Sequence, residues 1–491
     1  MVNKPKLLAA ILIVMTGATL PAQDQDQSAQ PAVTIFNNNF AVVRQTIPMD
    51  LKAGVNQVTF ADATAHIEPD SVMLRDLTGR RVLHILEQNY RNDPLSQELL
   101  LFLNEGKVVE FQTGEWVDNQ GQKHESTVQG RIIRSGYQNQ GTPIVEVNGR
   151  LQFDLPGSPV FSALGHDTIL KPTLNWLLQT DQPGSSIAQL SYVTGGMSWH
   201  ADYNVVASPK GDTLDLVGWV TIENNTGKVF DNARIKLMAG DVNKLAPNIP
   251  MSSFNGAMAY AAKAEVASVS EKAFDEYHLY TLERPATLHD RETKQVEFVV
   301  ASGVKSHKIY VYNGAALDNR YGYYGFEQIR NDASYGTQSN PKVWVMQEFK
   351  NSKANHLGMP LPKGRLRFYR QDDDGQMEFT GENVIDHTPT DETVRVYTGN
   401  AFDIVGERRR VDYKVDTYRK FADESFEIKV RNHKKEAVEV RVVEKLYRGT
   451  NWELTDKTHE YKKLDSQTIE FPVQIPADGE RVVTYTAHYT W

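Results

Sequence analysis

The chain has 491 residues, enough for roughly two to four domains, and its 40 % hydrophobic and 23 % charged content is typical of folded protein. The formal net charge of −9 argues against a nucleic-acid partner, because nucleic-acid-binding proteins present a basic face. There is no cysteine, which excludes disulfides, thiolate metal sites and cysteine nucleophiles.

Residues 1–22 have the layout of a secretory signal peptide. Two lysines precede a short apolar run from Leu7 to Met15, and small residues follow it. The run is too short for a membrane-spanning helix, which takes about 20 residues. Residues 23–31 then form a polar tether. We therefore expect export to the periplasm or the extracellular space, with no transmembrane segment once the signal is removed. An exported chain without disulfides fits a bacterial periplasm or cell surface.

The first third of the mature chain predicts short strands separated by turns. Residues 32–104 alternate apolar and polar side chains and predict an N-terminal β domain, with one helix at 95–104. Residues 105–161 hold short strands closed by glycines, which favours a small barrel-like β unit. Within it, the Asn-Gly pair at 148–149 predicts a tight hairpin. Residues 162–186 are expected to be a connector.

The remainder, 187–491, predicts one or more β-sandwich domains. In one predicted strand Leu216 and Val220 share a face, and Trp219 points to the other. The Ala-, Ser- and Met-rich stretch 246–275 sustains no apolar face and is expected to be a flexible loop. The fold class predicted for the whole chain is therefore all-β: a multi-domain β-sandwich architecture with a small barrel-like insert and few helices.

Two charged motifs have ordinary structural explanations. The Asp-rich DDDG run at 372–375 lies between two strand patterns and predicts a hairpin turn. A calcium loop would need ligands at alternate positions and a distant glutamate. The arginine run 408–410 is expected on a solvated strand edge rather than at an anion site. The histidines are scattered without zinc spacing, and no phosphate-binding motif is present, so the sequence predicts no metal and no cofactor.

Several blocks in the second half of the chain have a distinctive sequence and order. They are LSYVTGGMSWHADYNVV (190–206), ENNTGKVFDNARIKLMAGDV (223–242), FDEYHLYTLERPATL (274–288), GMPLPKGRLRFYR (358–370) and YTGNAFDIVGERR (397–409). From about residue 187 onward the chain is similar to the bacterial family called domain of unknown function 4139, whose relatives include mucoidy-inhibitor-like proteins. The resemblance implies a place in the cell envelope and no established activity. Those relatives carry a long coiled coil between two domains, whereas 107–161 predicts β structure here.

The first of these blocks supplies the candidate site, which consists of Trp199, His200, Asp202 and Tyr203. With Ser198, the histidine and aspartate suggest a catalytic triad. However, alternate residues of a strand lie about 7 Å apart, too far for a hydrogen-bonded relay. The serine also lacks the G-x-S-x-G turn of a nucleophile. We therefore predict a polar patch on the sheet face or a turn cap rather than a catalytic set, with ligand binding by these residues as the alternative.

The leading hypothesis is an exported, non-enzymatic β protein of the bacterial envelope that binds or supports an envelope protein or a polysaccharide. The aromatic residues of 321–326 could stack on such a partner. One alternative is an envelope hydrolase that uses Asp202 and Asp241 as acid and base. Another is an outer-membrane β-barrel, because 483–491 alternates toward a terminal aromatic residue. The sequence makes no prediction of oligomeric state.

Overall fold

The computed structural model describes residues 30–79, 81–139, 141–164, 168–209, 211–240, 242–244, 269–315, 323–372 and 374–491. Strands dominate these residues, so the all-β prediction is confirmed. The predicted signal peptide lies outside the described residues, as do nearly all of the tether and most of the loop expected at 246–275. No helix in the described ranges has the length and apolar character that crossing a membrane requires. The helices are α1 (Gln97–Leu103), α2 (Phe326–Asn331) and the 3-10 turns Pro69–Ser71, Tyr137–Asn139 and Lys353–Asn355.

An eight-stranded sheet joins strands from distant parts of the sequence, in the order β16-β17-β15-β1-β2-β12-β4 with β18 beside β15. Its strand β1 runs parallel to β15, with Val33 opposite Ile235, and antiparallel to β2. The predicted boundary at residue 187 falls inside β12, so the segments on either side of it share one sheet. The strands are β1 (Ala32–Phe36), β2 (Phe40–Leu51), β4 (Met73–Asp76), β12 (Gly184–Gly195), β15 (Phe230–Ala239), β16 (Val269–Phe274), β17 (Tyr277–Leu282) and β18 (Ala286–Leu288).

A three-stranded sheet, β3 (Gly54–Ala61), β11 (Thr173–Thr180) and β5 (His84–Arg91), packs against the same core with β11 in the middle. Strand β11 lies in the stretch 162–186 that the sequence suggested was a connector. Leu177 interrupts the alternation of apolar and polar residues in this segment, so the sequence pattern did not predict a strand. Trp176 is only 1 % exposed, and its Nε1 donates to Gln88 Oε1 at 2.9 Å.

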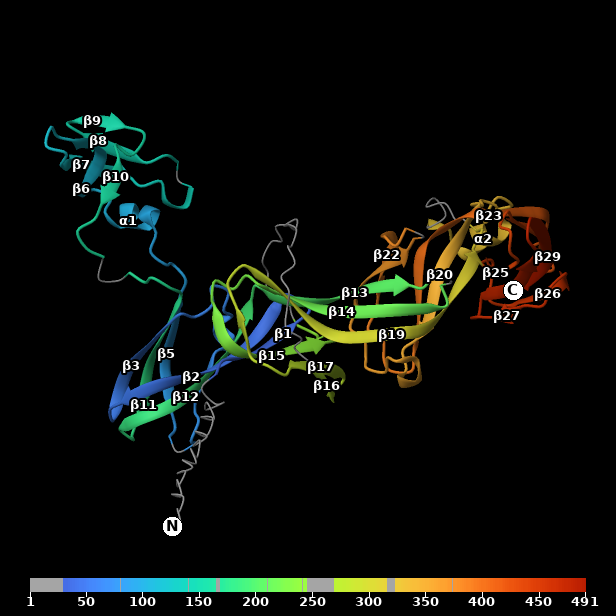
Figure 1. The fold of residues 1–491 in the computed structure, drawn as a ribbon, viewed down its shortest axis with the longest axis horizontal. Helices are drawn as coiled ribbons and strands as arrows, with labels where there is room; N and C mark the ends of the chain where they lie inside the picture. The colour runs from blue at the N-terminus through green and yellow to red at the C-terminus, as the bar shows by residue number, and fades with distance from the viewer. Residues whose placement is uncertain are drawn as a thin grey trace, which may run out of the picture.

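The insert forms its own five-stranded sheet, which lies apart from the other sheets (Figure 1). Where a barrel-like unit was expected, the described strands form an open sheet with β10 and β9 at its edges. The predicted helix is present as α1, whose Leu101 packs with Phe111. The predicted hairpin at 148–149 is also confirmed, with φ of 50° and 73° at its two residues. The strands are β6 (Val108–Val117), β7 (Lys123–Arg134), β8 (Ile144–Val147), β9 (Arg150–Gln152) and β10 (Ser158–Val160).

The largest sheet has thirteen strands, and its main path runs β22-β21-β13-β14-β19-β20-β23-β24-β29-β26. The hairpin predicted at 372–375 is confirmed, because it joins the antiparallel pair β21 and β22. The last strand, β29, directs its alternate residues into the C-terminal core. The strands are β13 (Met197–Ala207), β14 (Thr213–Asn224), β19 (Glu292–Tyr312), β20 (Lys342–Lys350), β21 (Gly364–Gln371), β22 (Met377–Ile385), β23 (Thr393–Asp416), β24 (Phe421–Asn432), β25 (Val438–Lys445), β26 (Trp452–Lys457), β27 (Lys462–Lys463), β28 (Thr468–Ile475) and β29 (Gly479–Thr490).

Strand β21 pairs in parallel with β13, and a glycine permits the approach. A Cβ atom added to Gly364 would lie 2.3 Å from the carbonyl oxygen of Ala201. Because this neighbour is backbone, it cannot rotate away as a flexible side chain would. Any larger residue at position 364 must push the two strands apart.

We expect Gly364→Ala to lower the free energy of unfolding by about 1–3 kcal/mol, the usual cost of overpacking. The matched control is Gly449→Ala, since a Cβ there would lie at an ordinary 4.0 Å from the Tyr489 ring. Denaturant unfolding of both variants measures the difference. Equal stabilities would show that the two strands separate at little cost.

Candidate functional site

Strand alternation divides the four predicted binding residues between two faces of β13. The side chains of Trp199 and Tyr203 are 1 % and 0 % exposed and belong to the core. Trp199 Nε1 donates to the carbonyl oxygen of Met238 at 3.2 Å, and the Tyr203 hydroxyl donates to that of Pro362 at 2.7 Å. Only His200 and Asp202 lie on the outer face, where a ligand can reach them. The binding role of all four residues stays a prediction.

His200 and Asp202 contact each other directly. Their Nε2 and Oδ2 atoms lie 3.1 Å apart. The expectation that about 7 Å separates them is wrong, because that value is the backbone spacing and the two side chains lean together. Ser198 donates its hydroxyl to Glu223 Oε2 at 3.4 Å. The serine is thus held by a carboxylate on β14, and the histidine by the aspartate.

Three neighbouring strands complete the surroundings of Asp202. Thr221 on β14 donates its hydroxyl to Asp202 Oδ2 at 3.0 Å, and Gln295 on β19 donates to the Thr221 oxygen at 3.1 Å. Arg367 on β21 places Nη1 3.6 Å from Asp202 Oδ1. The site therefore spans β21, β13, β14 and β19, and these contacts could not be read from the spacing along one strand.

The charges of this pair reinforce each other. Burial acts to raise the pKa of Asp202, but the His200 hydrogen bond and charge outweigh it and hold that pKa below its ordinary value. The hydrogen bond from Asp202 raises the pKa of His200, against the opposing effect of burial. Asp202 is therefore ionised near neutral pH and has its acceptor oxygens occupied.

A groove runs along this outer face and mixes both signs of charge. Glu223 lies on one side, and Lys363 and Arg365 lie on the other. Both cations are exposed, and in the described part of the chain neither side chain makes an ion pair. Asn37, from the turn between β1 and β2, donates to the Trp199 carbonyl at 3.0 Å and so brings the N-terminal segment to the groove.

A family model described as domain of unknown function (DUF4139) matches residues 188–491, more than half of the chain. The chain belongs to this family. Strands β13, β14, β19 and β21 all lie in the DUF4139 segment, so the groove does too, except for the contributions from Asn37 and Asn38. No curated protein matches the chain.

The DUF4139 segment also contains a buried cluster of charges at its C-terminal core. Arg408 Nε lies 3.0 Å from Glu444 Oε1, and the Tyr485 hydroxyl donates to Glu444 Oε2 at 2.6 Å. Arg448 Nη2 lies 2.8 Å from Glu424 Oε1. Burial acts to lower the pKa of Arg408, but the Glu444 charge raises it well above its ordinary value. Groups with strongly shifted pKa values often lie at functional sites, so the role of this cluster must be identified from its contacts.

The cluster corrects the prediction for the arginine run 408–410. Arg408 is 4 % exposed and lies in the core, so its placement on a solvated edge is wrong. Arg409 is exposed and pairs with Glu427, as a solvated edge would have it. Alternation along β23 sends neighbouring residues to opposite faces, and the buried partner of Arg408 lies on β25, far away in sequence.

Residues 323–341, the capping segment, cover this cluster. Arg408 Nη1 donates to the carbonyl oxygen of Gly336 at 2.7 Å, and the Tyr447 hydroxyl donates to the same oxygen at 2.8 Å. Arg448 Nη2 donates to the carbonyl oxygen of Tyr335 at 3.1 Å. The buried arginines thus hold the capping segment through its backbone carbonyl groups, which is a structural role.

The aromatic cluster predicted at 321–326 belongs partly to the capping segment. Tyr323 and Phe326 are 94 % and 75 % exposed. Tyr324 stacks on Tyr335, with ring centroids 6.3 Å apart. Tyr321 lies outside the described residues. The cluster is therefore divided between solvent and the packed cap.

We expect Glu444→Gln to destabilise the protein by about 3–5 kcal/mol, because it leaves the Arg408 charge buried without its counter-ion. The control is Arg409→Met, which breaks an exposed ion pair worth at most about 1 kcal/mol. Chemical denaturation followed by tryptophan fluorescence measures both. Similar effects for the two variants would contradict a buried ion pair.

The pH dependence of the His200 and Asp202 pair provides a second test. The raised pKa of His200 contributes stability that is complete below its ordinary value of 6.5 and is lost as pH rises through the folded pKa. The lowered pKa of Asp202 contributes stability above its ordinary value of 3.8, which is lost as pH falls through the folded pKa. The pair therefore stabilises the fold most between these two ordinary values.

We expect Asp202→Asn to move the pKa of His200 downward, since its largest raising cause is removed. An NMR pH titration of the His200 ring protons measures the shift. Ser198→Ala is the matched control, because Ser198 contacts Glu223. An unchanged His200 pKa in Asp202→Asn would show that the two side chains are apart in solution.

Proposed function

We propose that this protein is an exported component of the bacterial envelope that binds another envelope protein through the groove around His200 and Asp202. The export part rests on the charged, apolar and small-residue pattern of residues 1–22. The binding part rests on one observation: the outer face of β13 and β21 presents the exposed cations Lys363 and Arg365 beside carboxylates that are already fixed in place.

The state of Asp202 supports binding over hydrolysis. A general acid must hold a proton near neutral pH. Because the pKa of Asp202 is lowered, its carboxyl group is ionised there and has no proton to donate. Its oxygens already face Thr221, His200 and Arg367. Asp241, the second carboxylate of the hydrolase hypothesis, lies outside the described residues.

The chemistry of the groove favours a protein over a polysaccharide. Aromatic faces supply much of the apolar contact area in binding sites, and the two aromatic residues of the motif, Trp199 and Tyr203, are in the core. The groove instead offers Glu223, Lys363 and Arg365, a mixture of charges that complements a partner surface of mixed charge. Such complementarity sets specificity and association rate more than affinity.

The test is fractionation of cells that make the full chain, followed by crosslinking and recovery of bound proteins. We expect the protein in the periplasmic fraction and one repeated crosslinked partner. Arg365→Glu should abolish that crosslink, because it reverses the charge of an exposed side chain that makes no ion pair within the described residues. The matched control, Arg481→Glu, reverses an exposed arginine on β29, outside the groove, and should leave the crosslink intact.

Two results would overturn the proposal. A cytoplasmic location would remove the export part. Retention of every crosslink in Arg365→Glu, or binding of an envelope polysaccharide in place of any protein, would remove the groove as a protein-binding surface.

A further inference from the structure

Two cations, Lys308 and Arg370, lie at the edge of the core beneath β19 and β21, where the Lys308 side chain is exposed and that of Arg370 is half-buried. On β19, Lys308 continues the row of Val304 and Ser306, which are 0 % and 1 % exposed. On β21, Arg370 continues the row of Leu366 and Phe368, which are 0 % and 2 % exposed. Strand alternation therefore directs both cations to the inner side, opposite to the groove of the proposed function.

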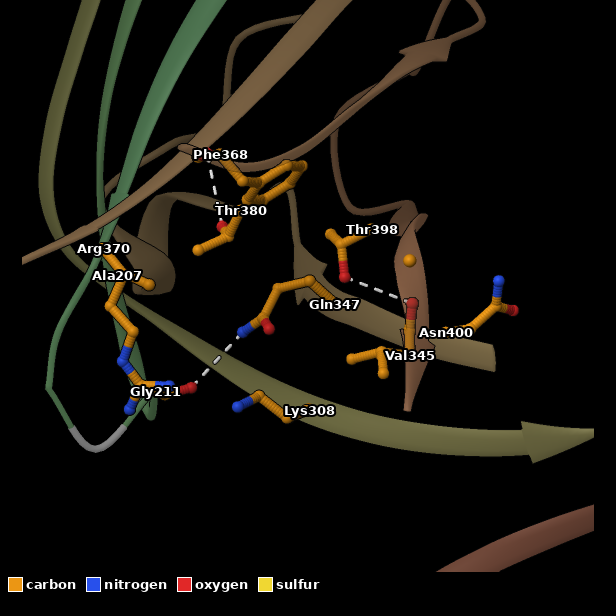
Figure 2. Close-up of a pocket in the computed structure, with 11 residues that line it drawn as sticks. Ala207, Gly211, Lys308, Val345, Gln347, Phe368, Arg370, Thr380, Thr398 and Asn400 are labelled. Atoms are coloured by element: carbon orange, nitrogen blue, oxygen red, sulfur yellow. Dashed lines mark hydrogen bonds between the residues drawn. The ribbon is translucent and has the colours of Figure 1, made fainter. Parts of the chain in front are cut away.

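The sheet curls back on itself here, which creates a cavity. Strand β22 comes against β23 without forming a hydrogen-bonded ladder, and Asn383 Nδ2 donates to the carbonyl oxygen of Tyr397 at 3.1 Å. A Cβ on Gly381 would lie 2.1 Å from the carbonyl oxygen of Thr398, so a glycine permits the contact. Beside this seam lies a cavity of about 170 Å³, lined by residues of β13, β19, β20, β21, β22 and β23 (Figure 2). Ligand sites are commonly concave pockets that combine apolar surface with a few polar groups.

The cavity lining carries positive charge and no carboxylate among the described residues. Figure 2 shows the Arg370 side chain reaching down to Gly211, with Lys308 on the same side of the cavity. Lys308 Nζ lies 3.9 Å from the position that a Cβ would take on Gly211. Arg370 donates to the carbonyl oxygen of Pro209. No hydrogen bond or ion pair of the Lys308 ammonium is present in the described part of the chain.

The remaining polar groups of the cavity are fixed by the protein. Gln347 is 6 % exposed, and its Nε2 donates to Ser306 Oγ at 2.6 Å and to the Gly211 carbonyl oxygen at 3.3 Å. Thr380 and Thr398 donate their hydroxyls to backbone carbonyls at 3.2 Å each. Val345 and Phe368 supply apolar surface. The polar groups left for a ligand include the Lys308 ammonium and the Arg370 guanidinium, whereas the Asn400 amide points away from both (Figure 2).

The positive charges around Lys308 repel one another. Burial, and then the charges of Arg370 and Lys434, lower the pKa of Lys308, and Glu436 alone opposes them. The whole chain has a formal net charge of −9, so an excess of positive charge at one cavity stands out against it. A bound anion would relieve this repulsion.

We propose that this cavity is a second binding site, which takes a small organic anion. Its carboxylate or phosphate group would lie between Lys308 and Arg370, and its short carbon body would lie against Val345 and Phe368. The site does not rest on the proposed function, because it lies on the inner side of β13 and β21 and shares no residue with the groove.

Isothermal titration calorimetry of the full chain tests the site with three probes: glucuronate, glycerol phosphate and uncharged glucose. We expect one or both anions to bind, glucose not to bind, and the preferred anion to identify the charged group. Binding should weaken as salt is added, a readout that needs no variant.

Lys308→Met should weaken binding of that anion about tenfold or more, because it removes a charge-assisted hydrogen bond. Lys342→Met is the matched control, since Lys342 is an exposed lysine at the far end of β20 from Gln347 and should leave binding unchanged. Circular dichroism checks that each variant is folded. The proposal is overturned if neither anion binds, if glucose binds equally well, or if both lysine variants bind as tightly as the unaltered chain.

Discussion

The architecture of the DUF4139 segment depends on long strands that each bury side chains in two separate cores. Strand β19 contributes Val296 and Val304 to the central core, and Tyr310 and Tyr312 to the C-terminal core. Strand β23 likewise contributes Val394 and Val396 to the central core and Ile404 to the C-terminal core. Because a strand is stiff along its axis, the two cores cannot move apart without breaking hydrogen bonds of these strands. Figure 1 shows β19 running between the middle of the molecule and its C-terminal end.

This continuity explains why both candidate sites lie on the same strands. The outer face of β13 and β21 carries the polar groove, and the inner face of β13, β19 and β21 ends at the cationic cavity. Each site draws its residues from strands that the ladder holds in register, such as Asp202 opposite Arg365. Groups placed on paired strands are held more firmly than groups on loops, which suits recognition of a ligand.

Burial and charge separate structural clusters from candidate sites in this protein. The pKa values of Arg408 and Tyr485 are raised well above their ordinary values in a cluster that solvent does not reach, and Arg408 holds the capping segment. The groups offered to ligands, Arg365 and Lys308, are exposed and lack ionic partners in the described structure. A perturbed pKa therefore does not by itself mark a functional site in this protein, because burial inside the core produces one too.

Side-chain alternation and turn residues by themselves determined the all-β class, the helix α1 and the hairpins at 148–149 and 372–375, because these depend on residues close in sequence. The family was evident from the resemblance of several sequence blocks, and the family model confirms it. Only the tertiary structure decided that β1 pairs with β15, that Arg408 meets Glu444, and that Lys308 and Arg370 share a cavity. In each case the partners lie tens to hundreds of residues apart. Sequence spacing reports which face a residue takes on its own strand, whereas strand order and register decide what lies opposite that face.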